Sequence, residues 1–421
     1  MTTITEVEAI EVLDSRGNPT VRTTVRTEDA VGVFTVPSGA STGKHEAVEV
    51  RDGAHRYDGK GVQQAVECVN EELAQIVVGS DVTQQRTLDE QLEAYDGTTS
   101  LGNVGANAIL GVSGAVAHAA GDAAAEPLHR YLSEKYGAEP SLPMPMVNII
   151  SGGLHAKGGI EIQDFLVIPR QATSIAEALE IVWNVRNAVR TSIVEDGHRP
   201  LVADEGGFAP PMDTIDEAFE ILLDGIERAG YTPGEQVVIA MDVAASHFYD
   251  SESETYRLES TNRKLTPDEM ASMVVSWTES YPIVSIEDPL AEDDWHGWTQ
   301  LAEKLDESVQ LLGDDLLVTN PERLDRAIDE GAASAVLVKP NQAGTLSKAI
   351  DVIRTAQRED VSPVVSARSG ETCDTTIADV AVGLNAGQIK IGSLSRSERL
   401  AKYNRLLEIE QRESFELSNP F

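Results

Sequence analysis

The sequence predicts an α/β protein in which a small N-terminal α+β domain precedes a barrel of parallel strands. Two observations lead to this fold class. In the 421-residue chain, β-branched runs alternate with helical sequence after about residue 140, and continuous apolar runs fit strands buried on both faces. Before that point, stretches of alternating apolar and polar residues are typical of antiparallel strands. About eight strands alternating with helices over roughly 280 residues indicate a closed α/β barrel.

The N-terminal domain is predicted from three segments. Residues 21–27 (VRTTVRT) and 31–36 (VGVFTV) read as antiparallel strands, and Ala-rich helical sequence follows from about residue 105 to residue 131. We therefore expect an N-terminal α+β capping domain at residues 1–137 and a catalytic barrel domain at residues 138–421.

The barrel strands are predicted from eight runs that end in or near charged residues. They are 160–169, 200–205, 236–242, 281–288, 309–315, 334–339, 362–368 and 387–390. Helix starts lie between them: Thr266 and Glu269 flank Pro267 in a capping-box pattern, and Asn320 precedes Pro321 in a similar way.

The charge of the chain excludes several functions. It has 33 Lys and Arg against 70 Asp and Glu, a formal net charge of −37. Such a surface repels phosphate backbones and anionic lipid, so we expect neither nucleic-acid nor membrane partners. An anionic substrate would need local cations or a bound metal to reverse the field.

The cysteine count and the N-terminus bear on localisation. Cys68 and Cys373 are too few for a disulfide framework or a four-thiolate zinc site. Glu6, Glu8 and Glu11 stand where a signal peptide needs a basic and then an apolar run. No window holds about 18 uninterrupted apolar residues. We expect a cytoplasmic protein.

Charged residues gather where the predicted strands end. They are Asp242, Glu287, Asp314, Lys339, Arg368 and Lys390. The carboxyl ends of barrel strands form the rim on which active sites are built, so these groups should converge. Three carboxylates without a nearby His or Cys favour Mg²⁺ over zinc. Lysines beside that metal are expected to have lowered pKa values and to act as bases, removing a proton next to a carboxylate while the metal holds an enediolate.

Eight longer motifs carry a resemblance over essentially the whole chain. They are LDSRGNPTV (13–21), PSGASTGKHEAVEVRD (37–52), DEGGFAP (204–210), SIEDPLAEDDW (285–295), GDDLLVTNPERL (313–324), KPNQAGT (339–345), RSGET (368–372) and RSERLAKYN (396–404). In their order and spacing they resemble the enolase family. The resemblance implies an N-terminal α+β domain and an atypical barrel that starts β-β-α-α.

Roles follow from the matching positions. The resemblance implies two Mg²⁺ ions, the first on Asp242, Glu287 and Asp314 and the second helped by Ser41. Lys339 matches the base that removes the C2 proton, and Glu205 the acid that assists departure of the C3 hydroxyl. The other matches are His155 near the leaving group, Asp164 in the catalytic network, Gln163 and Lys390 on the substrate, and Arg368 and Ser369 on its phosphate. The family is usually dimeric or octameric, so a homo-oligomer is expected.

The chain departs from the family pattern around the departing hydroxyl. An active-site histidine of the family is Ala367 here, and a glutamate of the catalytic network is shortened to Asp164. Asn is replaced by Ser151 in the family's NGG motif, and Ser393 lies in a further altered segment. Replacing His by Ala removes a donor, and Glu to Asp withdraws a carboxylate by about one methylene.

Three functions remain open. The first is a diverged paralogue, such as carboxyphosphonoenolpyruvate synthase in phosphonate biosynthesis, that acts on a small phosphorylated or phosphonate three-carbon acid. The second is an authentic enolase that dehydrates 2-phosphoglycerate to phosphoenolpyruvate. The third is a non-catalytic binding protein on the same scaffold, which loss of Lys339 or of a metal ligand would have indicated.

Overall fold

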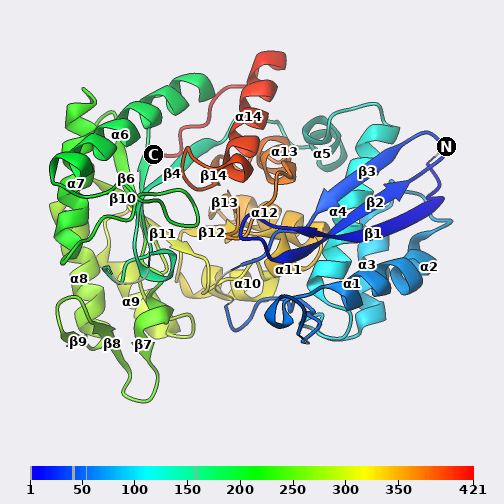
Figure 1. Ribbon diagram of the computed structural model, residues 1–421, viewed down its shortest axis with the longest axis horizontal. Helices are drawn as coiled ribbons and strands as arrows, with labels where there is room; N and C mark the ends of the chain where they lie inside the picture. The colour runs from blue at the N-terminus through cyan, green and yellow to red at the C-terminus, as the bar shows by residue number, and fades with distance from the viewer. Residues whose placement is uncertain (1, 40–42, 54, 157–158) are drawn as a thin grey trace.

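The N-terminal part of the chain forms a three-stranded sheet covered by helices. The computed structural model describes residues 2–39, 43–53, 55–156 and 159–421 (Figure 1). Strands β1 (Glu6–Leu13), β2 (Pro19–Arg26) and β3 (Val31–Thr35) pair antiparallel in that order, which confirms the two predicted strands. The helices are α1 (Gln63–Cys68), α2 (Ala74–Val77), α3 (Gln85–Asp96), α4 (Ala106–Ala123) and α5 (Leu128–Tyr136).

Helix α4 packs directly on the sheet because small residues line the contact. A Cβ on Gly32 of β3 would lie 2.0 Å from the Ala115 carbonyl oxygen, and a Cβ on Gly114 would lie 2.4 Å from the Phe34 ring. The absence of side chains at these two glycines lets helix and strand approach this closely. The Ala-rich segment predicted as helical is therefore a buried core helix.

In the part of the chain that the structure describes, eight strands form a closed barrel, which confirms the predicted fold class. In barrel order they are β4 (Met144–Ser151), β5 (Asp164–Ile168), β6 (Val238–Asp242), β10 (Ile283–Glu287), β11 (Gln310–Gly313), β12 (Ala335–Val338), β13 (Ser362–Ser366) and β14 (Gln388–Lys390). Strand β5 runs antiparallel to β4 and β6, and every other neighbouring pair is parallel.

The helices follow the strands in the order that the resemblance implies. Two strands, β4 and β5, precede α6 (Ile175–Glu195) and α7 (Ile215–Arg228), so the barrel begins β-β-α-α. The remaining helices are α8 (Pro267–Ser280), α9 (Trp295–Lys304), α10 (Pro321–Glu330), α11 (Pro340–Ala343), α12 (Leu346–Arg358), α13 (Thr376–Gly383) and α14 (Ser397–Arg412). A small sheet of β7 (Tyr249–Asp250), β8 (Thr255–Leu258) and β9 (Arg263–Leu265) lies before α8.

Both predicted helix starts are confirmed. Thr266 and Glu269 exchange hydrogen bonds in a capping box, with Pro267 in the first turn of α8. The Asn320 side chain accepts from the Arg323 amide at the start of α10. These caps satisfy amides that lack partners within the helix.

One predicted strand is wrong. Residues 200–205 form no barrel strand: Leu201 is 63% exposed, and Val202 makes only an isolated bridge to Phe208. The eighth strand is instead β4, which is buried at all eight positions. Because β4 contains two Met, a Pro and an Asn, it does not form a run of β-branched residues and is not predicted as a strand.

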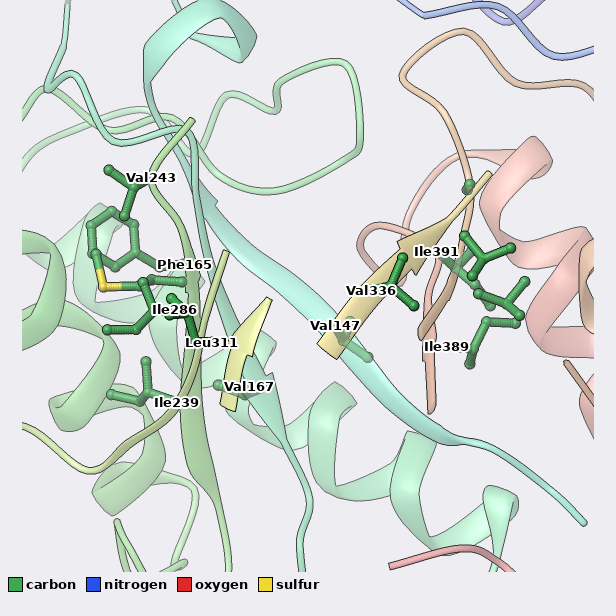
Figure 2. Packing of buried hydrophobic residues seen from close by; sticks show 14 of the residues in the cluster. Val147, Phe165, Val167, Ile239, Val243, Ile286, Leu311, Val336, Ile389 and Ile391 are labelled. Atoms are coloured by element: carbon green, nitrogen blue, oxygen red, sulfur yellow. The ribbon is translucent and has the colours of Figure 1, made fainter. Parts of the chain in front are cut away.

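The core lies on both faces of the barrel wall. Alternate residues such as Met146, Leu166 and Ala240 fill the barrel interior, while their neighbours Val147, Val167 and Ile239 pack outward. Figure 2 shows part of the outer layer, with Phe165 on β5 and Ile286 on β10, the two strands that flank β6. This period of two fits strands buried on both faces.

Among the described residues, no single helix has the length and apolar character needed to cross a membrane. The helices α4 and α5 pass such a test only as a pair, with a bend of 92° between them. Most of α4 is buried in the protein core, where apolar composition is ordinary.

Candidate active site

The strands bring the predicted site residues to one rim of the barrel. Asp242, Glu287 and Lys390 are the last residues of β6, β10 and β14, while Asp314 and Lys339 directly follow β11 and β12. Parallel strands place these ends together. Because β5 runs the other way, its first residue, Asp164, reaches the same rim and pairs in register with Asp242.

Lys390 joins two of the predicted metal ligands. Its Nζ donates to Asp242 Oδ2 at 2.9 Å and to Glu287 Oε2 at 2.6 Å. Gln163 Nε2 also donates to Asp242 Oδ2, at 3.1 Å. All four side chains are nearly inaccessible to solvent, so the ammonium compensates two buried carboxylates.

The third predicted ligand, Asp314, pairs with the predicted base. Lys339 Nζ donates to Asp314 Oδ2, and Gln342 Nε2 donates to Asp314 Oδ1 at 2.8 Å. Gln342 also donates to Glu46 Oε1 at 3.1 Å. The N-terminal part of the chain therefore contributes a carboxylate beside the rim.

Arg368 is held by the same carboxylate. Its Nη1 donates to Glu46 Oε2 at 3.0 Å and to Asn341 Oδ1 at 2.9 Å. Burial opposes the guanidinium charge, but Glu46 and then Asp314 hold the pKa of Arg368 above its ordinary value. Ser369 is buried beside it.

The lysine pKa values differ from the expectation of lowered values. Burial disfavours the charged form of Lys339, yet Asp314 raises its pKa above the ordinary value. For Lys390 burial is outweighed by Asp242 and Glu287, which raise its pKa strongly. The expectation assumed a metal on these carboxylates, and such a cation would compete with the lysines for them.

A second group of polar residues lies on the β4–β5 side of the mouth. His155 ends the short 3₁₀ turn η3 (Gly153–His155), and its Nδ1 lies 2.9 Å from Asp164 Oδ2. The other oxygen of Asp164 accepts from Ser151 Oγ at 2.7 Å and from Asn148 Nδ2 at 2.5 Å. A carboxylate oxygen of Glu205 lies within 4.8 Å of a ring nitrogen of His155 and of a carboxylate oxygen of Asp164.

Glu205 is ionised in this setting. Burial would raise its pKa, but Arg399 and then His155 hold the pKa of Glu205 below its ordinary value. Arg399 Nη1 lies 3.9 Å from Glu205 Oε1. Glu205, which is predicted to act as an acid, is therefore ionised at neutral pH when only the charged groups of the protein surround it.

The rim fits a hard divalent cation. Glu287 Oε1 and Gln163 Oε1 are buried and have no hydrogen-bond partner among the residues that the structure describes. Burial, and then the charge of Asp242, raises the pKa of Glu287 well above its ordinary value. An all-oxygen donor set with two orphaned oxygens, whose negative charge Lys390 offsets only in part, suits Mg²⁺. Ser41, predicted at a second Mg²⁺, lies outside the described residues.

Several residues that contact the site residues are not predicted from the sequence. They are Glu46, Asn341 and Gln342 around Arg368 and Asp314, Asn148 beside Asp164, and Arg399 beside Glu205. Glu46, Asn341 and Gln342 belong to the longer motifs but end no predicted strand, so a search for charged strand ends passes over them. Only spatial proximity assigns these residues to the site.

At the end of β13 the rim carries the methyl side chain of Ala367, where the family pattern has a histidine. Ala367 follows β13 directly and is 6% exposed. Its amide donates to the Lys390 carbonyl oxygen at 2.9 Å, which ties the end of β13 to β14. The backbone therefore keeps the barrel geometry while the side chain offers no proton donor.

An eight-stranded barrel with carboxylates and lysines on its carboxyl rim has the architecture of the α/β-barrel enzymes. The family model described as "Enolase, N-terminal domain" matches residues 4–132, and "Enolase, C-terminal TIM barrel domain" matches residues 139–417. The chain belongs to the enolase family, as the motifs predict. It is thus an enolase-superfamily protein in which the family's N-terminal domain precedes the barrel.

Proposed function

We propose that the protein is a Mg²⁺-dependent enzyme that forms an enediolate from a substrate of the 2-phosphoglycerate or phosphoenolpyruvate type. We further propose a diverged paralogue with altered chemistry, such as carboxyphosphonoenolpyruvate synthase. The observation that carries the proposal is the contrast at the rim. Lys339, Arg368 and the carboxylates stand together, whereas Ala367 and Asp164 differ from the family where a hydroxyl would depart.

The cations of the rim support an anionic substrate. Arg368 and Ser369 would take the phosphate or phosphonate group, and Lys390 and Gln163 the carboxylate. In a chain of net charge −37 these buried cations provide local attraction that the surface lacks. The proposed substrate is a small phosphorylated or phosphonate three-carbon acid.

Lys339 would remove the proton at C2. Mg²⁺ held by Asp242, Glu287 and Asp314 would neutralise the negative charge that grows on the substrate carboxylate as this proton leaves. Lys339 Nζ lies beside Asp314 with its side chain 12% exposed, and Mg²⁺ on that carboxylate would release the amine to act as a base from this position.

A cleft beside the mouth supports the use of a second reactant. It has a volume of about 750 Å³ and opens between the η3 turn and the β7–β8 hairpin. Its lining includes Gly153, Ile160, His247 and Arg257. The cleft shares the η3 turn with the His155 side of the site.

Authentic enolase is the second candidate. The observation that favours it is that Glu205 and His155 are both retained, with a Glu205 carboxylate oxygen within 4.8 Å of a His155 ring nitrogen. A non-catalytic role has less support, because Lys339 and all three predicted metal ligands are present on one rim.

The decisive assay follows formation of phosphoenolpyruvate from 2-phosphoglycerate by absorbance, at low and high salt. We expect binding with slow turnover, because general acid help and positioning each contribute about 10²-fold or more. Slow turnover partly restored by Ala367→His with Asp164→Glu supports the paralogue. Turnover of roughly 10 s⁻¹ or above identifies an authentic enolase with a tolerant pocket.

A further inference from the structure

Asp164 is bonded to the protein on both carboxylate oxygens. Ser151 and Asn148 donate to Oδ1, at 2.7 and 2.5 Å, and His155 Nδ1 lies 2.9 Å from Oδ2. Asn148, Ser151 and Asp164 are each at most 1% exposed. A carboxylate with three protein partners in a closed setting is typical of a group that orients a neighbour.

Two of the departures from the family meet in this network. Ser151 and Asp164 are cross-strand partners of the antiparallel pair β4–β5, so the serine hydroxyl reaches the shortened carboxylate directly. The backbone of Gly207 closes the other side, since a Cβ there would lie 2.4 Å from Asn148 Oδ1 and 2.6 Å from Ser151 Oγ. Close packing and a direct hydrogen bond therefore couple Ser151 and Asp164, the two positions that depart from the family pattern.

We propose that Asn148, Ser151 and Asp164 are positioning residues that orient His155, and that His155 is the proton-bearing group facing Glu205 and the substrate. The inference deepens the proposed function by assigning this side of the site. Asp164 is then not the catalytic carboxylate that its position in the family motif predicts. In the family pattern a glutamate at position 164 belongs to the catalytic network. Here Asp164 instead holds the imidazole of His155, and that imidazole faces the substrate.

The surrounding charges agree with this assignment. Burial opposes the charge of His155, but Asp164 outweighs it and raises the pKa of His155 to about 9. Glu205 and Asp242 act in the same direction, whereas His247 from the turn Ala245–Phe248 is a nearby imidazole that interacts with His155 unfavourably when both are charged. Glu205 is ionised, so His155 is the residue of this pair that carries a proton at neutral pH. A cation here favours an anionic or hydrogen-bond-accepting group of the ligand.

The first test is an NMR titration of the histidine side chains in the full-length protein, with His155 assigned by loss of its signal in His155→Gln. We expect the pKa of His155 to fall from about 9 toward about 6.5 in Asp164→Asn. Ser192→Ala is the control, because Ser192 Oγ donates to Asp224 at 2.6 Å in another, partly exposed serine–carboxylate pair. An unchanged pKa in Asp164→Asn overturns the inference.

A measurement on the unaltered protein covers the case in which Asp164→Asn does not fold. Side-chain ¹⁵N shifts above pH 9 should show the neutral imidazole of His155 with its proton on Nδ1, because Asp164 accepts there. The opposite tautomer overturns the inference.

The second test separates this inference from the proposed function. Exchange of the C2 proton of 2-phosphoglycerate with solvent should remain in His155→Gln and Asp164→Asn, since Lys339 performs it. Residual phosphoenolpyruvate formation should fall at least tenfold in each, and the double variant should be no slower than His155→Gln. Independent losses that multiply overturn the inference. Absent exchange in the unaltered protein contradicts the proposed function and leaves the titration result standing.

Discussion

The two sides of the barrel mouth are organised differently. On the side of Lys339 and Arg368, charged groups at strand ends pair with one another and with Glu46 of the N-terminal part. On the side of His155, a network of Asn148, Ser151 and Asp164 comes from β4 and β5 alone. The first side keeps most residues of the enolase motifs but includes Ala367, and the second holds the departures at Ser151 and Asp164. Under the proposed function, substrate binding and proton removal would be retained while the handling of the departing group changes.

The largest expected effect is on the first side. Lys339→Ala should lower solvent exchange of the C2 proton by about 10³-fold or more, because a positioned base acts mainly in the transition state. Binding of phosphoenolpyruvate through Arg368 and Ser369 should remain, as followed by calorimetry. Exchange at the unaltered rate would move the base role to Lys390.

The next test breaks the link between the first side and the N-terminal part. Glu46→Gln should lower the free energy of unfolding by about 3 kcal/mol, because the buried Arg368 loses its charged partner. Denaturant midpoints measure the change. Glu6→Gln is the control, since the Glu6–Arg26 pair is exposed and should contribute less than about 1 kcal/mol. Equal effects of both variants would contradict the importance of the buried pair.

The His155 side of the barrel mouth should make the free energy of unfolding depend on pH. The pKa of His155 is raised to about 9 in the folded protein, against about 6.5 when unfolded. Its contribution is therefore fully present below pH 6.5 and is lost as the pH rises through 9. We expect a loss of about 1–3 kcal/mol over this window.

Comparison with His155→Gln isolates this term. Asp315, whose pKa is raised to about 8 chiefly by burial, also lowers stability as the pH rises and is unchanged in the variant. Parallel stability curves for the two proteins between pH 6.5 and 9 would show that His155 contributes nothing.

The smallest effect concerns the metal. Asp314→Asn should weaken Mg²⁺ binding at least tenfold, about 1.4 kcal/mol, because one of three converging carboxylates loses its charge. Calorimetric titration of Mg²⁺ measures it, with Glu6→Gln as a control far from the rim. Unchanged affinity would remove Asp314 from the metal site.

Most of the first side could be predicted from the sequence. Asp242, Glu287 and Lys390 end barrel strands, and strand ends follow from apolar runs that stop at a charge. The capping box at Thr266 is equally local. The misplaced strand at 200–205 shows where local reasoning fails: composition favours that segment, but burial selects β4, whose Met, Pro and Asn residues match no strand pattern.

The second side depends on long-range geometry. The reversed direction of β5 brings the beginning of that strand, and with it Asp164, to the rim where the other strands end. Nothing in the local pattern near Asp164 specifies that reversal. The partners Ser151 and Asn148, and the ionised state of Glu205 beside Arg399, follow only from the folded arrangement.

The sequence by itself determined the fold class, the family and the residues that end most barrel strands, because hydrophobic periodicity and short motifs are local properties of the chain. The tertiary structure decided which of these residues are paired, which carboxylates are ionised and which side chain bears a proton. Those properties depend on burial and on the charges that other elements bring within a few ångströms, and both arise only when the barrel closes.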